Sequence, residues 1–153
     1  MPDVELISKK TINTHIKTLA NKIAQSNIEY QYIVGIARGG LNISKPLSKL
    51  LKIPHKTIRV SFYTNNFRHA YPSIVNVKSL DLIDKSKKIL IIDDLIDGGH
   101  TFNWLECNIK SYISYDIAVI YNNERNQFGI KPTYYAEIKP DTWLVFPWEH
   151  SRP

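Results

Sequence analysis

Apolar and polar residues follow one another along the first third of the chain with spacings that predict a helix, a strand and a second helix. Between Thr11 and Ile23, apolar side chains recur about every 3.6 residues, which predicts an amphipathic packing helix. Tyr30 to Ile36 is a mostly apolar run typical of a buried strand, and Leu41 to Leu51 returns to helical spacing. Ala37 to Gly40 connects the two, so the order is strand, glycine loop and helix.

The middle of the chain predicts two strands separated by an irregular segment. Lys56 to Tyr63 alternates weakly and predicts a strand, whereas Thr64 to Pro72 is polar, aromatic and without a clear period, as expected of a mobile loop. The strongest strand pattern is Lys88 to Asp93, where consecutive aliphatic residues end at two aspartates. A loop from Asp94 to His100 is expected to follow it.

The last third continues the alternation of helices and strands. A helix is predicted from Thr101 to Tyr112, and strands are predicted at Ile117 to Tyr121 and Tyr134 to Ile138, before the aromatic segment Trp143 to Trp148. Strands that alternate with helices predict an α/β fold with a mostly parallel central sheet flanked by helices. Because no internal repeat or Gly/Ser linker divides the chain, residues 1–153 are expected to form a single domain.

Composition narrows the class of protein and its partners. Hydrophobic residues make up 43% and charged residues 22%, close to the averages for globular domains, which excludes disordered and fibrous classes. No apolar run reaches the about 20 residues of a membrane-spanning helix, and the first residues lack a signal-peptide pattern, so a cytoplasmic protein is expected. Cys107 is the only cysteine, and its place in a predicted helix favours a buried, unreactive thiol. The net charge of +6 favours anionic partners, either a polyphosphate or nucleic acid, unless it only makes the surface soluble.

Candidate chemistry is concentrated in the segment Asp93 to Thr101, at the carboxyl end of the strongest strand, where parallel sheets bind ligands. Gly98 and Gly99 allow a tight turn whose N–H groups, together with the N-terminus of the next helix, suit a phosphate. Asp93 and Asp94 repel phosphate, but they accept hydrogen bonds from sugar hydroxyls and bind Mg²⁺. A phosphorylated ribose with a bound metal ion would suit both the glycine turn and the aspartate pair. An ordinary glycine turn at an acidic strand end is the alternative.

This segment resembles the phosphoribosyl pyrophosphate signature of the type I phosphoribosyltransferases, in which an apolar strand is followed by two acidic residues, two apolar residues and Asp-Thr-Gly-x-Thr. The loop Gly35 to Leu41 is similar to the pyrophosphate loop of that family. Asp141 to Trp143 and Pro147 to Glu149 resemble the C-terminal, base-binding end of bacterial xanthine-guanine phosphoribosyltransferases. The resemblance implies the type I phosphoribosyltransferase fold, with a flexible hood loop from Ser61 to Arg68.

The resemblance also implies how phosphoribosyl pyrophosphate would bind. Arg38 and Gly39 would contact the pyrophosphate, with Arg68 as a second contact. Asp93 and Asp94 would bind the ribose hydroxyls and Mg²⁺, with Asp94 as the metal ligand. The cradle of the 5′-phosphate would be formed by Gly98, Gly99, His100 and Thr101.

For the base, the resemblance implies one catalytic residue and one stacking residue. Asp97 would face the purine N7, where a carboxylate can take or give a proton as the glycosidic bond forms. Trp143 would stack on the purine and the backbone of Leu144 would contact its edge, with a core position as the alternative for Trp143. Trp104 and Trp148 are assigned to the core or to an interface.

The sequence departs from the family pattern at two places. Gly98 stands where the signature has threonine, so one hydroxyl contact to phosphate is missing. Purine members of the family have a lysine that binds the 6-oxo group just after the strand equivalent to Ile117 to Tyr121, whereas this chain has Asn122-Asn123-Glu124-Arg125. The Asn123 amide or Arg125 could contact the base, but neither reproduces a compact ammonium, so the preferred base is left open.

Together, these residues and the resemblance predict a purine-salvage enzyme. It would transfer phosphoribose from phosphoribosyl pyrophosphate to guanine, xanthine or hypoxanthine, with Mg²⁺ as cofactor, as a dimer or tetramer of identical chains. The alternative is a regulatory protein of the same fold that retains the ribose-phosphate pocket and binds nucleic acid. Scattered lysine pairs such as Lys9-Lys10 and Lys87-Lys88 are more typical of a solvated surface, which argues against nucleic acid, and no membrane partner is expected.

Overall fold

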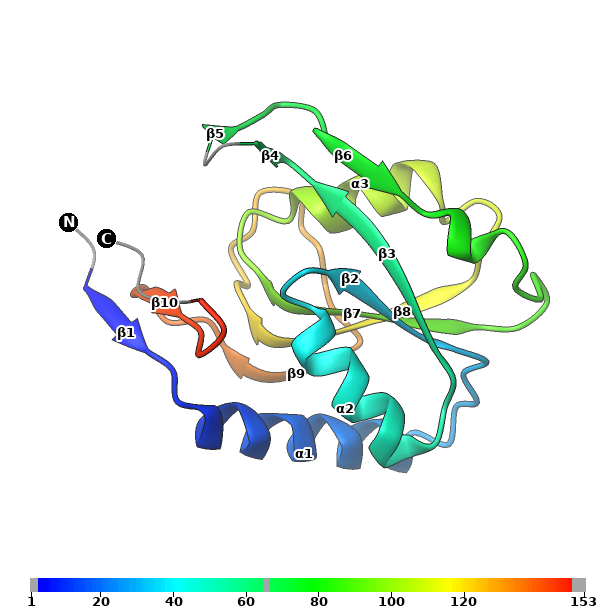
Figure 1. Ribbon diagram of the computed structural model, residues 1–153, viewed down its shortest axis with the longest axis horizontal. Coiled ribbons are helices and arrows are strands. Elements are labelled where there is room, and N and C mark those ends of the chain that lie inside the picture. Colours follow the sequence, from blue (N-terminus) through cyan, green and yellow to red (C-terminus); the bar gives the residue numbers. More distant parts are fainter. Residues whose placement is uncertain (1–2, 65–66, 150–153) are drawn as a thin grey trace.

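The computed structural model describes residues 3–64 and 67–149 of the chain (Figure 1). In chain order, its elements are β1 (Val4–Leu6), α1 (Lys9–Gln25), β2 (Ile33–Ala37), α2 (Leu41–Leu51), β3 (His55–Ser61), β4 (Tyr63–Thr64), β5 (Phe67–Arg68), β6 (Ile74–Asn76), the 3₁₀ helix η1 (Lys78–Leu80), β7 (Ile89–Ile96), α3 (His100–Asn108), β8 (Tyr115–Asn122), β9 (Tyr134–Ile138) and β10 (Trp143–Val145). They form the expected α/β architecture, with helices on both faces of a central sheet.

The central sheet has six strands in the order β6-β3-β2-β7-β8-β9. All neighbouring pairs in it are parallel except β3 and β6, which are antiparallel. Two small sheets lie beside it: the antiparallel hairpin β4-β5 and the parallel pair β1-β10, which brings the two ends of the described chain together. The prediction of a mostly parallel sheet is therefore confirmed.

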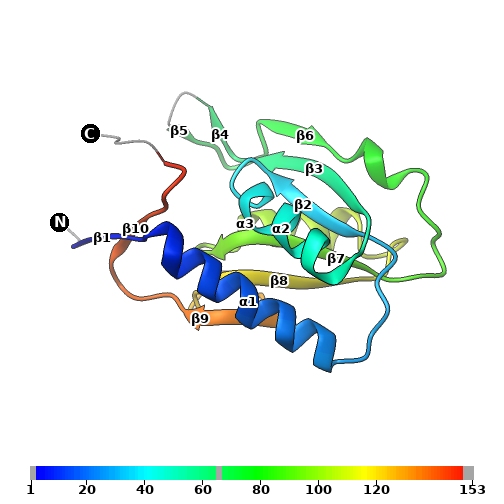
Figure 2. The ribbon, with the colours of Figure 1, turned by 60° about the horizontal axis from the view of Figure 1, so that its bottom comes forward.

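Alternation along the buried strands places two cores on opposite faces of this sheet. In β7, Leu90 and Ile92 pack with α1 and α2, whereas Ile89 and Ile91 pack with α3. The two views show the same layers, with α1 and α2 on one face and α3 on the other (Figure 2). Because every second residue of a strand points to the same face, a fully apolar run such as this one can serve both cores.

Helix α1 confirms the helix predicted from Thr11 to Ile23 and extends it at both ends. Its buried residues are those of the predicted apolar stripe, Ile12, Ile16, Leu19 and Ile23. The helix begins earlier because Ser8 caps it, accepting a hydrogen bond from the Thr11 backbone N–H at 3.1 Å.

Three predictions about local structure are wrong in detail. Strand β7 does not end at Asp93 but continues to Ile96, with Leu95 and Ile96 still paired with β8, so the loop before α3 begins at Asp97. Helix α3 ends at Asn108, not at Tyr112. The segment predicted as a mobile loop from Thr64 to Pro72 contains part of the β4-β5 hairpin, although residues 65–66 lie outside the described residues.

Cys107 also differs from its prediction, because its side chain is exposed and not buried. Helix α3 buries Phe102 and Leu105 against the sheet, and Cys107 lies on its outer side. None of the helices in the described part of the chain is long and apolar enough to cross a membrane.

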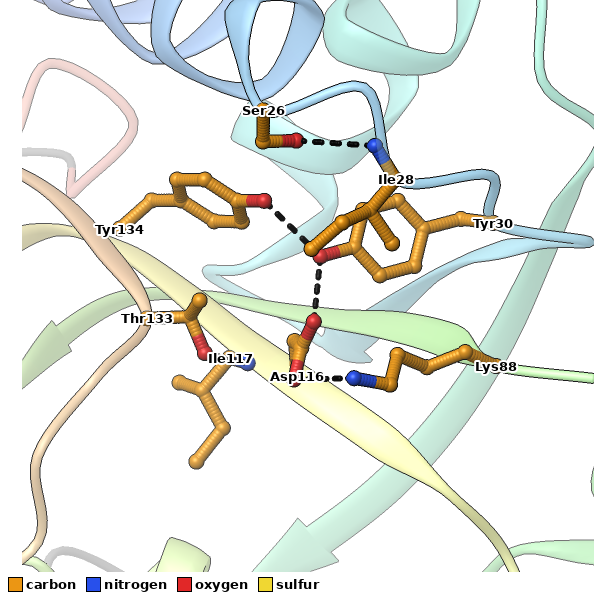
Figure 3. Close-up of polar contacts among 8 residues, drawn as sticks. All are labelled: Ser26, Ile28, Tyr30, Lys88, Asp116, Ile117, Thr133 and Tyr134. Carbon is orange, nitrogen blue, oxygen red and sulfur yellow. Dashed lines mark hydrogen bonds and ion pairs between the residues drawn. The ribbon is translucent and has the colours of Figure 1, made fainter.

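Polar side chains fasten the strands at the amino end of the sheet (Figure 3). The Tyr30 hydroxyl donates a hydrogen bond to the Asp116 carboxylate at 2.5 Å and lies 3.0 Å from the Tyr134 hydroxyl. On its other oxygen, Asp116 accepts a hydrogen bond from Lys88 Nζ at 3.3 Å. Burial, together with the bond to Asp116, raises the pKa of Tyr30 far above its ordinary value. The network lies at the amino ends of β7, β8 and β9, the opposite end from the loops considered next.

Candidate functional site

A cavity of about 670 Å³ opens at the carboxyl ends of the central strands. Its lining comes from the loop after β2, from β3 and the β4-β5 hairpin, from the end of β7 through the start of α3, and from Lys139 and the segment Trp143 to Glu149. The residues that the resemblance assigned to the site all line it, namely Arg38, Gly39, Arg68, Asp93, Asp94, Asp97, Gly98, Gly99, His100, Thr101, Trp143 and Leu144. Loops far apart in the sequence therefore meet where a parallel sheet binds ligands.

The N-terminus of α3 forms an open cradle of backbone donors. Gly99 is its N-cap residue, with a φ of 87°, and no side chain caps the helix in the described structure. The left-handed φ favours glycine, and a Cβ atom at Gly99 would lie 2.9 Å from the Asn126 side-chain oxygen. Backbone N–H groups of the first helical turn lack partners within the helix, and they carry the positive end of its dipole. Such a helix N-terminus is chemically suited to an anion such as a phosphate group.

His100 occupies the space that a side chain at Gly98 would need. A Cβ atom added at Gly98 would lie 2.8 Å from the His100 ring, which is held edge-on between Phe62 and Phe128 at centroid distances of 5.7 and 5.0 Å. Burial lowers the pKa of His100, and the charge of Arg68 adds to the effect. Where the family signature has a threonine hydroxyl, this chain has Gly98, and the His100 imidazole occupies the space beside it.

A second uncapped helix begins at the other loop. Helix α2 follows Gly40 without a side-chain cap, and Arg38 and Gly39, just before it, line the cavity. A Cβ atom at Gly39 would collide with the Asp94 carboxylate, so glycine is needed for this close approach. The two loops are therefore packed against each other, with Arg38 beside the second set of backbone donors.

Asp93 and Asp94 bring two carboxylates into the cavity between these helix N-termini. Both side chains are partly exposed to the cavity and otherwise enclosed by protein. The backbone N–H of Asp94 donates to Asp93 Oδ1 at 2.9 Å, and that of Leu95 donates to Asp94 Oδ1 at 2.8 Å. Burial raises the pKa of Asp94 to about 6 and raises that of Asp93 well above its ordinary value, with the negative charge of Asp94 contributing to the latter.

A bound cation would relieve the cost of ionising this pair, and carboxylate oxygens are the ligands that Mg²⁺ prefers. The described residues contain no group of three or more His, Cys, Asp or Glu side chains placed to hold a metal ion. Mg²⁺ commonly takes one or two carboxylates and completes its shell with substrate oxygens and water. The aspartate pair therefore fits a magnesium ion that arrives with a phosphorylated substrate.

Asp97 carries an exposed carboxylate beside a lysine that sequence reasoning missed. Its Oδ1 lies 4.0 Å from Lys139 Nζ. Lys139 directly follows strand β9, so its place at the carboxyl end of a parallel strand was the signal that could have found it. Asn123 donates its side-chain amide to the Asp97 carbonyl at 2.9 Å and thereby supports the loop.

The two substitutes considered for the missing lysine do not reach the cavity. Neither Asn123 nor Arg125 is among the described residues that line it. Asn122 is buried in the sheet at the end of β8, and Arg125 is exposed on the loop beyond it. The sequence left Asn123 and Arg125 open as base contacts, and the cation that lines this side of the cavity among the described residues is Lys139.

The C-terminal segment closes the remaining side with aromatic residues. Trp143 is 60% exposed and lines the cavity, which excludes the alternative of a core position, while Leu144 beside it is buried. Strand β10 is held by its parallel pairing with β1, which places Val4 opposite Trp143. The sequence assigned Trp148 and Trp104 to the core or to an interface. Trp148 stacks on Phe146 with a centroid distance of 4.7 Å and also lines the cavity. Trp104, on α3, packs against the core on that face of the sheet.

A family model, curated relatives and a solved structure all match most of this chain. The family described as "Phosphoribosyl transferase domain" matches residues 5–148. A xanthine-guanine phosphoribosyltransferase of Cereibacter sphaeroides is 34% identical over 124 residues, 80% of this chain and 71% of the relative. The bifunctional protein PyrR of Clostridium novyi is 28% identical over 147 residues, 88% of this chain and 83% of the relative. The crystal structure of a purine phosphoribosyltransferase from Pyrococcus horikoshii aligns with a TM-score of 0.79 at 28% identity, covering 99% of this chain and 97% of that one.

Proposed function

The chain belongs to the phosphoribosyltransferase family, and on that premise we propose that it transfers phosphoribose from phosphoribosyl pyrophosphate to a 6-oxopurine base. The products would be the nucleoside monophosphate and pyrophosphate, as in purine salvage. The single cysteine is in keeping with work in the reducing cytoplasm.

We assign each part of phosphoribosyl pyrophosphate to a different part of the cavity. The 5′-phosphate would bind the α3 cradle from Gly98 to Thr101, and the pyrophosphate would bind Arg38, Gly39 and Arg68. Asp93 and Asp94 lie between these two anion sites, where the ribose hydroxyls and Mg²⁺ would be held. Bound Mg²⁺ would neutralise charge on the departing pyrophosphate.

Transfer would proceed without a covalent intermediate on the protein. The C1′–O bond breaks and its electron pair leaves with the pyrophosphate, while the purine N9 forms the new bond to C1′. The base gives up one proton, and we assign the Asp97 carboxylate to accept it from N7. The developing positive charge on the sugar would lie near Asp93 and Asp94, so the chain would act mainly by positioning the reactants and by electrostatic stabilisation.

Water must be kept away from the activated ribose, and the β4-β5 hairpin is placed to do this. Tyr63 and Arg68 are exposed, yet both line the cavity. Closure of the hairpin over bound substrate would bring Arg68 to the pyrophosphate and exclude water.

One observation carries the proposal: two uncapped helix N-termini flank an aspartate pair, with Asp97 and an exposed tryptophan on the same cavity. The test is a substrate screen in which guanine, xanthine, hypoxanthine, adenine, uracil and orotate are each supplied with phosphoribosyl pyrophosphate and Mg²⁺. Turnover with a 6-oxopurine supports the proposal. Turnover with uracil or orotate alone would assign a different base, and turnover with none would refute the transferase assignment.

A regulatory role is the second candidate, because a relative named bifunctional protein PyrR matches 88% of this chain. Such a protein could keep the ribose-phosphate site and bind nucleic acid through its positive charge. An electrophoretic mobility assay with RNA and DNA at physiological salt tests it. Binding that survives this salt in a chain without turnover would favour regulation. Assembly as a dimer or tetramer stays a prediction, which size-exclusion chromatography with light scattering measures.

A further inference from the structure

We infer that Lys139 is a specificity-determining residue, whose ammonium recognises the 6-oxo group of the base and discriminates against a 6-amino group. The inference rests on the proposed function, because it assumes that a purine lies on the Trp143 side of the cavity. It names a residue outside the segment after β8, where this chain has asparagines.

The protein holds the Lys139 ammonium in place on the base side. Its backbone N–H donates to the Asn122 carbonyl at 2.8 Å, which ties the end of β9 to the end of β8. The side chain is only 16% exposed. Its Nζ donates to the carbonyls of Pro140 at 3.1 Å and Thr142 at 3.4 Å. Because Thr142 directly precedes Trp143, the same contacts set the ammonium beside the proposed stacking residue.

One donor of this ammonium is left for a ligand. An ammonium has three N–H donors, and the two carbonyls use two of them. The carboxylate of Asp97 is 4.0 Å away, which is too long for a hydrogen bond. A ligand atom that accepts a hydrogen bond next to Asp97 would therefore satisfy the third donor and keep the favourable charge pair.

The position of Lys139 separates it from the other cations of the cavity. Arg38, Arg59 and Arg68 come from the loop after β2, from β3 and from β5. In the sheet order, β2 and β3 lie on one side of β7, and β9 lies on the other. Among the described lining residues, Lys139 is the cation that follows β9, and it donates to the carbonyl of Thr142, which directly precedes Trp143. The arginines are thus available to phosphates and Lys139 to the base.

An ammonium beside a carboxylate matches one edge of a 6-oxopurine. Guanine presents O6, an acceptor, next to N7, whereas adenine presents an amino donor in place of O6. With N7 at Asp97, the 6-substituent would face Lys139. A 6-oxo group would accept a hydrogen bond from Lys139, but a 6-amino group would set one donor against another and leave one donor of the mostly buried ammonium unsatisfied.

The test compares binding of inosine monophosphate and adenosine monophosphate, which differ at the 6-position, by calorimetry on the wild type and on Lys139→Met. We expect the wild type to prefer the 6-oxo nucleotide. We expect the variant to bind it about tenfold to a hundredfold more weakly while binding to the 6-amino nucleotide changes little, since a hydrogen bond to a charged group is lost. The matched control is Lys22→Met, because Lys22 Nζ also donates to a backbone carbonyl, that of Tyr135 in β9, but does not line the cavity.

A brace for the loop is the competing role of Lys139, and it predicts something different. If Lys139 only braced the loop, its loss would lower the affinity for both nucleotides equally. Lys139→Gln, which keeps a donor for the carbonyls, would then restore both affinities. An unchanged ratio of the two affinities in either folded variant overturns the inference, as does a wild type without preference. Nucleotide binding is measured apart from turnover. A chain that prefers the 6-oxo nucleotide through Lys139 but transfers no phosphoribose would refute the enzyme and retain the inference.

Discussion

Replacing Trp143 by alanine tests the proposed base site most directly. The indole is 60% exposed and lines the cavity beside Leu144, on a short strand whose backbone is held by β1. Removing the ring should therefore remove a stacking surface while leaving the backbone of β10 in place. We expect the variant to lose affinity for purine nucleotides and to keep its affinity for phosphoribosyl pyrophosphate.

The loss of folding stability follows from the exposure of Trp143, and the loss of nucleotide affinity follows from the general strength of base stacking. A large aromatic side chain buries up to roughly 250 Å², so the two fifths of Trp143 that are covered amount to about 100 Å². At about 25 cal/mol per Å² this is about 2.5 kcal/mol, and because alanine still covers part of the area, the free energy of unfolding should fall by about 1–2 kcal/mol. A fully buried tryptophan would cost about 3–5 kcal/mol. Stacking on a base is worth about 1–3 kcal/mol, so nucleotide affinity should fall by about 5-fold to 150-fold.

Calorimetric titrations with guanosine monophosphate and with phosphoribosyl pyrophosphate and Mg²⁺ measure the two affinities, and a thermal melt confirms folding. Trp104→Ala is the matched control, because Trp104 packs on the core under α3 and is not among the described residues lining the cavity. It should lower the melting temperature without selective loss of the nucleotide. Unchanged nucleotide affinity in folded Trp143→Ala would refute the stacking role and, with it, the placement of the base.

Three further perturbations have defined outcomes. Asp97→Asn should lower kcat by about 10²–10⁴ and change the affinity for phosphoribosyl pyrophosphate little, since an amide accepts no proton; unchanged kcat in a steady-state assay would leave Asp97 without a proton-transfer role. Removing Mg²⁺ with a chelator should weaken phosphoribosyl pyrophosphate binding in calorimetry, because its charge would then face Asp93 and Asp94 directly; equal affinity would exclude their metal-binding role. Tyr30→Phe should lower the free energy of unfolding by about 1.5–3 kcal/mol at neutral pH, since Asp116 loses a hydrogen bond. The folded pKa of Tyr30 is raised above 10.0, so this contribution is complete below pH 10 and falls as the pH rises further; urea unfolding from pH 8 to 11 should show the two proteins converging, and a constant difference would contradict the linkage.

The parts of the fold that local pattern determines were predictable, and the parts that pairing determines were not. The stripe of α1 and the apolar run of β7 specify their elements because each buries a face whose period is visible in the sequence. The extension of β7 to Ile96 is different, because pairing of Leu95 with Tyr121 and of Ile96 with Asn122 supplies partners for a backbone whose aspartates suggested an end. Strand β1 is likewise short and forms by pairing with β10, from the other end of the chain.

The candidate site shows the same division. A motif in one segment predicted the α3 cradle and the aspartate pair, and all their residues line one cavity. The proposed base side is built from three separate strand ends. The sequence suggested residues just after β8 for it, but Asn123 there supports the loop by donating to the Asp97 carbonyl. Lys139 lay one strand further along the sheet. Its proximity to Asp97 follows from the parallel order of β7, β8 and β9, which no single segment displays.

The helix N-termini give an independent reason to regard this cavity as a binding site, because the residues around it lower the stability of the folded chain. Helix α1, away from the cavity, is capped by Ser8, whereas α2 and α3, which start at the cavity, follow glycines and have no side-chain cap in the described structure. A capping side chain typically contributes about 1 kcal/mol. Between those two helices, Asp93 and Asp94 have raised pKa values, so their ionisation disfavours the folded state as the pH rises. Helix N–H groups without partners attract negative charge, and crowded carboxylates attract positive charge. A phosphorylated sugar bound with a divalent cation, as proposed, would satisfy both. Departures from local stability rules are expected where function requires them, and in this chain they converge on one cavity.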